Sequence, residues 1–176
     1  MQAQLKVAKP AGALNRPTPR TNALQKLATP LSVLERRTHP SGQSSLHTTG
    51  TFAAGEDICA FKPKQLLGQP TMYSVQVSED THIELDPEIL RYANHSCAPS
   101  VFFDTAAGKV VALTDLQAGD EVTFFYPSTE FKMSEPFSCG CGSSCCLGTI
   151  SGAAHIDKAR LQGYRLNKHI SDVLLS

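Results

Sequence analysis

Hydrophobic and polar residues alternate in short runs over most of the chain, separated by clusters rich in Gly, Pro, Ser and Asp. Alternation over about four to eight residues between turn formers is typical of β-strands. The clearest case is VFFD (101–104) and VVALTD (110–115), which AAGK with Gly108 joins as a hairpin. The segments predicted to contain strands are residues 32–37, 49–61 around Gly55, 71–77, 101–104, 110–115 and 122–126.

Two segments show helical spacing instead. PEILRYA (87–93) begins with Pro87, which suits the first position of a helix. DKARLQGYRLNKHISDVLL (157–175) places apolar residues three to four positions apart, with an interruption at Gly163. Strands and helices do not alternate as βαβ units, so a parallel nucleotide-binding fold is not expected. The pattern predicts a β-rich (α+β) fold of short strands with a C-terminal helix.

The first thirty residues differ in composition from the rest. They are rich in Pro, Ala, Thr and basic residues, and only LQKLA (24–28) has the pattern of a helical turn. We interpret residues 1–30 as a flexible basic arm. No apolar run approaches the roughly 20 residues of a membrane span, and the N-terminus lacks the apolar stretch of a secretory signal. We therefore expect an intracellular protein, nuclear or cytoplasmic, without a membrane association.

The 16 basic and 16 acidic residues are distributed unevenly. Residues 1–45 hold seven Lys or Arg and one acid, Glu35, whereas residues 46–136 hold five Lys or Arg and thirteen acids. An acidic body attracts cationic substrates and repels polyanions, although the same charges also suit a plain solvated surface. The basic arm suits either a contact with nucleic acid or simple disorder.

Four of the six cysteines fall within FSCGCGSSCCLG, residues 137–148. In a chain without a secretory signal, such a cluster indicates metal binding before disulfides. Cys139, Cys141 and Cys146 have a spacing that can enclose one tetrahedral zinc ion, which needs a fourth ligand from elsewhere. The distant candidates are Cys59 and Cys97. The alternative is a set of buried free thiols or a disulfide.

Cys97 belongs to a second polar cluster, the sequence NHSC at residues 94–97. His95 and Cys97 lie two positions apart, and we expect their imidazole and thiol not to align at hydrogen-bond distance. A Cys/His nucleophile pair is therefore not expected here, and a metal ligand is the preferred interpretation of Cys97. Cys145 and Cys59 are expected to be small buried side chains.

Three segments follow one another in the chain: RYANHSCAPSV (91–101), GDEVTFFY (119–126) and FSCGCGSSCCLG. They resemble, in order, the R-F-x-N-H-S-C-x-P-N signature, the G-E-E-L-T-x-x-Y strand and the post-SET zinc segment C-x-C-x4-C-x-G of SET-domain lysine methyltransferases. TGTFAAGEDI (49–58) is similar to the opening G-x-G-x-F-A turn of that family. The resemblance covers roughly residues 32–150. It implies a SET core at 31–136, a post-SET zinc-binding segment at 137–150 and a C-terminal helical tail at 151–176, with a C-terminal segment threaded through an earlier loop.

The chemistry implied by this resemblance is transfer of a methyl group from S-adenosylmethionine (SAM) to an amine, usually a lysine side chain. The implied cofactor-binding residues are Gly50, Thr51, Phe52, Arg91, Tyr92, Asn94, His95 and Leu147. The implied ligands of a structural zinc ion are Cys97, Cys139, Cys141 and Cys146.

Tyr126 matches the catalytic tyrosine of the family. A narrow channel lined by its hydroxyl and by backbone carbonyls can orient a neutral amine for in-line attack. Phe124 matches the position that controls how many methyl groups fit, and phenylalanine leaves room for more than one. Tyr73 is expected to line the same channel, although a core tyrosine is equally compatible with its position.

The sequence departs from the pattern of the family in four places, which bear on the substrate. Thr48 stands where the family has the first glycine of G-x-G, Phe125 where it has aspartate, and Ser100 where it has asparagine. In addition, only about thirty residues separate Phe61 from Arg91, an interval that normally holds a longer insert forming one wall of the peptide groove.

Three functions are therefore open. The first is a protein-lysine methyltransferase with a minimal groove, completed by a second copy in a homodimer or by the arm. The second is an N-methyltransferase of a free amino acid or another small amine. The third is an inactive SET-like binding module, against which the retention of Tyr126 argues.

Overall fold

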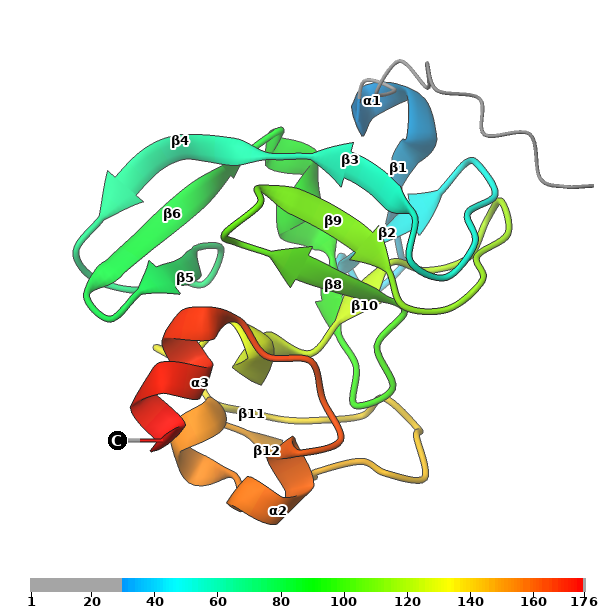
Figure 1. The fold of residues 1–176 in the computed structure, drawn as a ribbon. Coiled ribbons are helices and arrows are strands. Elements are labelled where there is room, and N and C mark those ends of the chain that lie inside the picture. The colour runs from blue at the N-terminus through cyan, green and yellow to red at the C-terminus, as the bar shows by residue number, and fades with distance from the viewer. Residues whose placement is uncertain (1–29, 176) are drawn as a thin grey trace, which may run out of the picture.

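The computed structural model of the chain describes residues 30–175. The predicted arm, with its helical turn at 24–28, lies outside the described residues except for Pro30. Within the described part, no helix is both long enough and apolar enough to cross a lipid bilayer. Short strands in several small sheets lie on one side of a group of short C-terminal helices (Figure 1).

The largest sheet has five strands in the order β3-β9-β8-β10-β7. These strands are β3 (Asp57–Ala60), β9 (Lys109–Ala112), β8 (Val101–Asp104), β10 (Thr123–Phe124) and β7 (Asn94–His95). The antiparallel pair β8 and β9 confirms the predicted hairpin. Gly108 in its turn has φ 63°, and a Cβ atom there would lie 2.8 Å from the carbonyl oxygen of Phe61. The turn therefore requires glycine.

Strand β10 lies between β7 and β8, both of which precede it in the chain, and it is parallel to each of them. Thr123 pairs with Asn94, and Phe124 pairs with both His95 and Val101. The strand is shorter than the prediction of 122–126, because a 3-10 turn, η2 (Tyr126–Ser128), follows with Pro127 in it. Tyr126 is thereby held at the end of β10, beside β7.

A separate three-stranded sheet, in the order β4-β6-β5, fills the interval before Arg91. Its strands are β4 (Lys62–Leu67), β5 (Val75–Ser78) and β6 (Thr81–Asp86). The predicted strand at 71–77 begins only at Val75, and β4 and β6 were not predicted. The predicted helix at 87–93 is a 3-10 helix, η1 (Glu88–Tyr92), with Pro87 capping it rather than opening it.

The first elements form a hairpin whose strands frame a glycine-containing turn. They are α1 (Pro30–Val33), β1 (Leu34–Thr38) and β2 (Ser44–Thr48). The prediction of a strand at 32–37 is wrong at its start, since residues 32 and 33 are helical, and β2 was not predicted. Of the predicted segment 49–61, only β3 and a single bridge between Phe52 and Leu116 are extended pairings.

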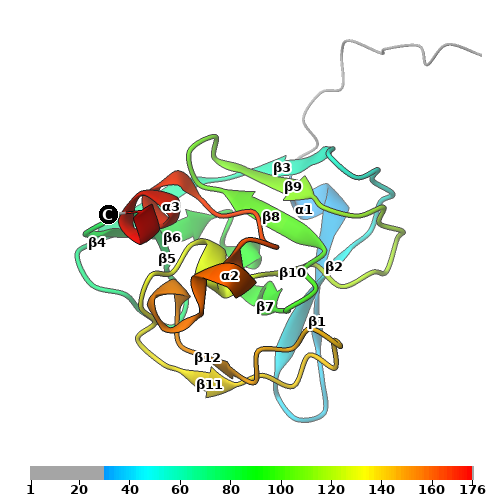
Figure 2. The ribbon, with the colours of Figure 1, turned by 60° about the horizontal axis from the view of Figure 1, so that its bottom comes forward.

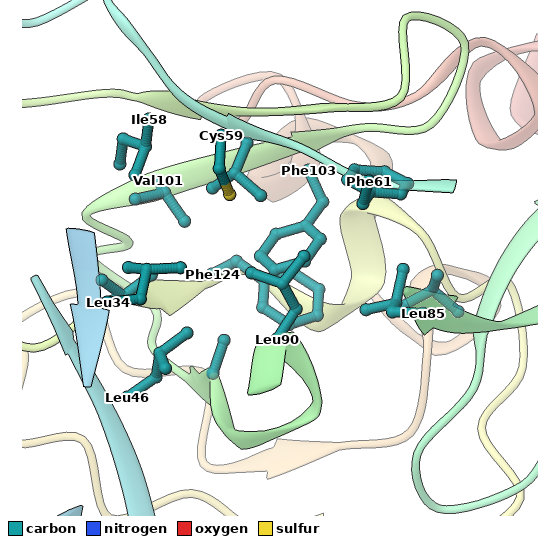
Figure 3. Packing of buried hydrophobic residues seen from close by; sticks show 14 of the residues in the cluster. Leu34, Leu46, Ile58, Cys59, Phe61, Leu85, Leu90, Val101, Phe103 and Phe124 are labelled. Atoms are coloured by element: carbon teal, nitrogen blue, oxygen red, sulfur yellow. The ribbon is translucent and has the colours of Figure 1, made fainter. Parts of the chain in front are cut away.

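The main hydrophobic cluster collects side chains from both sheets and the hairpin (Figure 3). Phe103 lies at its centre and is fully buried, with ring centroids of Phe124 and Phe61 at 4.4 and 5.8 Å. Leu34 and Leu46 reach it from the hairpin. None of these short strands would be stable alone. Burial of their apolar side chains in a common cluster stabilises the whole arrangement.

The C-terminal residues form a second layer under the core. Its elements are β11 (Phe137–Ser138), β12 (Thr149–Ile150), η3 (Ala153–His155), α2 (Lys158–Leu161) and α3 (Lys168–Leu175). The helical tail with an interruption around Gly163 is confirmed, as α2 and α3 flank that residue. Leu161 and Ile170 pack with Phe125 in a second cluster, so the tail, with α2 at the front in Figure 2, covers the segment that contains Phe125.

Asn167, between α2 and α3, joins this tail to the core through both ends of its buried amide. Its Nδ2 donates to the carbonyl oxygens of Phe103 (2.9 Å) and Ser128 (3.0 Å). Its Oδ1 accepts from the backbone N–H and the hydroxyl of Thr105, each at 2.9 Å. Asn167 therefore ties hairpin β8–β9 to the turn that follows Tyr126.

We expect Asn167→Ala to lower the free energy of unfolding by about 2–4 kcal/mol, because it leaves buried backbone groups without partners. Denaturant titration measures the change. Lys168→Ala, which removes only an exposed ion pair with Asp172, is the control and should cost at most about 0.5 kcal/mol. Equal losses in the two variants would contradict the anchoring role of Asn167.

Candidate active site

Tyr126 lies where β7, β10 and η2 meet, and its side chain is held by rings and one backbone acceptor. Its hydroxyl donates to the carbonyl oxygen of Ala93 at 3.1 Å. The ring of Phe124 lies 4.6 Å from it and that of His95 5.2 Å, centroid to centroid. Burial raises the pKa of Tyr126 to about 12, so the phenol stays protonated and can act as a hydrogen-bond donor or a polar contact.

A cavity of about 1090 Å³ opens in front of Tyr126. One wall comes from residues 70–75 and from η1, a second from the tip of hairpin β1–β2, and a third from residues 133–141. The volume exceeds what a single amine needs and allows two molecules to meet inside.

The cavity brings together most of the residues that the sequence assigned to the site. Those in its lining are Tyr73, Arg91, Tyr92, Asn94, His95, Phe124 and Tyr126. Gly50, Thr51 and Phe52 are not in this lining, and Leu147 lines a separate cavity of about 510 Å³ beside Tyr164. The cofactor roles of these four residues, like those of Arg91, Tyr92, Asn94 and His95, stay predictions.

The turn that lines the cavity is not the predicted one at residues 50–52 but the turn at Gly42–Ser44, which precedes it in the chain. The Nδ2 of Asn94 donates to the carbonyl oxygen of Ser44 (3.1 Å) and to Oε1 of Glu121 (3.0 Å). The sequence did not single out this turn as a binding segment, although PSGQSS carries a glycine between two strands and thus a signal for it.

Arg36 also lines the cavity, although the sequence did not single it out. Its Nη1 donates to the hydroxyl of Tyr92 at 2.9 Å, and its guanidinium lies 4.1 Å from the centroid of that ring. A cation held flat on an aromatic ring in this way is oriented without a carboxylate partner.

Tyr73 stands at the rim of the cavity rather than deep inside it. It is 42% exposed, and the guanidinium of Arg91 lies 3.9 Å from its ring centroid. Arg91 also pairs with Glu88. Tyr73 thus contributes to the entrance through its ring.

The sulfurs of Cys97, Cys139, Cys141 and Cys146 all lie within 4.8 Å of one another. This set of four thiols from two distant segments fits a tetrahedral zinc ion. Backbone N–H groups of Leu147 and Gly148 donate to the sulfurs of Cys97 (3.3 Å) and Cys146 (3.4 Å).

All six cysteines lie in the described residues, and none is in a disulfide. Cys59 is fully buried, as predicted. The prediction that Cys145 is buried is wrong: it is exposed, and its thiol donates to the carbonyl oxygen of Cys97 at 3.1 Å.

The expectation that His95 and Cys97 cannot align is also wrong. Nε2 of His95 lies 3.3 Å from the sulfur of Cys97, and its Nδ1 accepts the backbone N–H of Tyr126 at 3.3 Å. With Nδ1 as acceptor, Nε2 carries the hydrogen and donates to the sulfur. Burial lowers the pKa of His95 to about 4, so the ring is neutral and serves as a link between Tyr126 and the cysteine cluster.

Known proteins resemble this chain in both sequence and fold. Residues 36–127 match the SET domain. The chain is 46% identical over 106 residues to "Methyltransferase flvH" of Aspergillus flavus, a match that covers 59% of each protein. It is 33% identical over 75 residues to an H3 lysine-36 specific histone-lysine N-methyltransferase of Aspergillus oryzae, which covers 39% of this chain and 8% of that protein.

Two solved structures share the fold. The methyltransferase domain of human SETMAR superposes with a TM-score of 0.51 at 18% identity, over 68% of this chain and 58% of that one. KRYPTONITE in complex with mCHH DNA, H3(1-15) peptide and SAH gives a TM-score of 0.50 at 19% identity, over 66% and 29%. The chain thus spans less than two thirds of each of these relatives. Because the SET domain match covers more than half of it, the chain belongs to the SET-domain family.

Proposed function

We propose that this protein is a SAM-dependent N-methyltransferase, with a protein lysine side chain as its first candidate substrate. The observation that carries the proposal is the position of Tyr126. Its hydroxyl lies 3.1 Å from the carbonyl oxygen of Ala93, at a cavity shared with Asn94 and His95. The match to histone-lysine N-methyltransferases supports a protein substrate.

The cofactor side of the cavity is built by Arg91, Tyr92, Asn94 and His95, together with the turn at Gly42–Ser44. The hydrogen bond from Asn94 to Ser44 joins the two segments, so each holds the other in place. SAM supplies a methyl group on a sulfonium cation. Polar backbone groups and aromatic faces in this part of the cavity suit both the charge and the adenine of such a molecule.

On the amine side, Tyr126 and the carbonyl oxygen of Ala93 form a polar end to an otherwise apolar wall. Leu85, Leu90 and Phe124 supply that wall. The chain needs to align the amine lone pair and exclude water rather than supply a nucleophile. Phe124 has no hydroxyl to fill the space, so we propose that more than one methyl group is transferred.

A second candidate substrate is a free amino acid or another small amine. The interval between Phe61 and Arg91 forms only the small sheet β4-β6-β5, which leaves a short wall for a peptide. A small amine needs no longer groove, whereas a protein substrate would require the wall to be extended by a second copy or by residues 1–30. An inactive binding module is the third candidate.

Incubation of the purified protein with SAM separates these candidates. Histone H3 peptides are offered in one set of reactions, and free lysine and short alkylamines in the other, with product masses read out. We expect products with two or three added methyl groups in one of the sets. SAM binding without any product would support the inactive module, and absence of both binding and product would overturn the proposal.

Tyr126→Phe should lower kcat by about 100-fold or more, because it removes one polar group at the reacting centre. SAM affinity, measured by calorimetry, should change by no more than about twofold, since the ring remains. Tyr73→Phe is the control: it keeps the ring on which Arg91 stacks at the rim and should retain most of the activity. Unimpaired turnover by Tyr126→Phe would show that its hydroxyl is not used.

We also propose that the four-cysteine cluster binds one structural zinc ion inside the cell, where thiols stay reduced. Cys146→Ser should lose the zinc and lower the melting temperature by at least about 5 °C, because a zinc cluster contributes folding free energy. Zinc content by mass spectrometry and thermal melts measure both effects. Cys145→Ser is the matched control and should keep the metal; equal loss in the two variants would show that the ligand assignment is wrong.

A further inference from the structure

Glu130 is a buried carboxylate in the wall of the same cavity, and none of the roles above uses it. It lies two residues after the end of η2, and its backbone N–H donates to the carbonyl oxygen of Tyr126 at 2.9 Å. The residue is only 7% exposed, yet it lines the cavity together with Phe124 and Tyr126. A buried acid at such a place costs free energy of folding unless it is neutral or paired.

The described residues give this carboxylate hydrogen bonds but no firm cationic partner. Its Oε1 accepts the backbone N–H of Gln76 at 2.7 Å. Its Oε2 lies 3.6 Å from Nδ1 of His82, too far for a hydrogen bond. Burial lowers the pKa of His82 and raises that of Glu130 to about 7, so the imidazole is no lasting counterion.

The other charged side chains of the cavity are placed differently. Arg91 pairs with Glu88, and Glu121 accepts from Asn94. Arg36 lies against Tyr92 on the side of the cofactor residues. Glu135 also lines the cavity but is exposed. Among the described carboxylates in the lining, Glu130 is thus the buried one, and it lies on the side of β5.

We propose that Glu130 is a specificity-determining residue that binds the ammonium group of an aliphatic primary amine entering the cavity. This deepens the proposed function and rests on it. An amine with an ordinary pKa arrives protonated, and the wall of Leu85, Leu90 and Phe124 offers it no compensating charge. A carboxylate next to that wall stabilises the cation through a charge-assisted hydrogen bond and rejects uncharged molecules of the same shape.

If Glu130 had only a structural role, its hydrogen bonds would matter and its charge would not. Oε1 of Glu130 and Oε1 of Gln76 accept backbone N–H groups of Gln76 and Phe131, at 2.7 and 2.8 Å. These two bonds attach β5 to the segment after Tyr126. Glu130→Gln keeps the acceptor and the volume but removes the charge, so it separates attachment from charge recognition.

The probes are n-pentylamine and pentan-1-ol, which match a lysine side chain with its Cα atom in length and differ in charge. Their binding to the full chain in the presence of SAH is measured by NMR titration, so no turnover is needed. We expect the wild-type protein to prefer the amine by at least tenfold and Glu130→Gln to lose that preference. SAH affinity should stay unchanged, and the melting temperature should not fall, because the variant removes a buried charge and keeps the acceptor. Glu135→Gln, the exposed control, should keep the preference.

A preference for the amine that survives in Glu130→Gln, or its absence in the wild-type protein, would overturn the inference. If Glu130→Gln does not fold, the pair Glu130→Asp and Glu130→Asn, equal in shape, replaces it, and only the charged member should prefer the amine. Failure of the wild-type protein to bind SAH and to methylate any amine would instead overturn the proposed function. The two failures are therefore distinguishable.

Discussion

The site depends on the parallel pairing of β10 with β7 and β8. This pairing brings Tyr126 to Asn94 and His95, although the chain between them makes the whole β8–β9 hairpin first. Strand pairs of two residues are weak by themselves. The imidazole of His95 supplements the pairing, because it accepts from the backbone of Tyr126 and donates to the sulfur of Cys97. The neutral imidazole of His95 thus connects Tyr126 and the cysteine cluster to strand β7.

The C-terminal tail extends this arrangement from below. The Nδ2 of Asn167 donates to the carbonyl oxygen of Ser128, and Nε2 of His169 lies 2.9 Å from the carbonyl oxygen of Thr129. The turn after Tyr126 is therefore held at two consecutive residues. The ring of Tyr164 stacks on Phe125 at 3.7 Å, and its hydroxyl donates to the carbonyl oxygen of Cys97. Phe125 replaces the aspartate expected there by resemblance, and an aromatic residue suits the apolar surface of the tail.

The sequence predicted those parts whose signals are local. The β8–β9 hairpin has alternating residues and a glycine where φ is positive, and the cysteine spacing points to a cluster without any fold. Strand β6 carried the same signal in Ile83 and Leu85, which was overlooked. Strand β2 carried none, because Ser45, His47 and Thr48 are buried through tertiary hydrogen bonds. The position of the turn at Gly42–Ser44 beside the cavity and the burial of Glu130 likewise depend on contacts between distant segments, which no local pattern encodes.

Buried polar atoms without a hydrogen-bond partner occur on both sides of the cavity. On the cofactor side, Asn94 and Arg36 have partners within hydrogen-bond distance, whereas Nε of Arg91 has none among the described residues. On the side of β5, Nδ1 of His82 is buried without a hydrogen bond and lies 3.6 Å from Oε2 of Glu130. Buried polar groups without hydrogen bonds lower the free energy of unfolding. Replacing such groups by apolar side chains of similar volume often raises it. Glu130 lies in the wall of the cavity rather than in either hydrophobic cluster, which is the position that a charged ligand would require, since its arrival supplies a cationic partner.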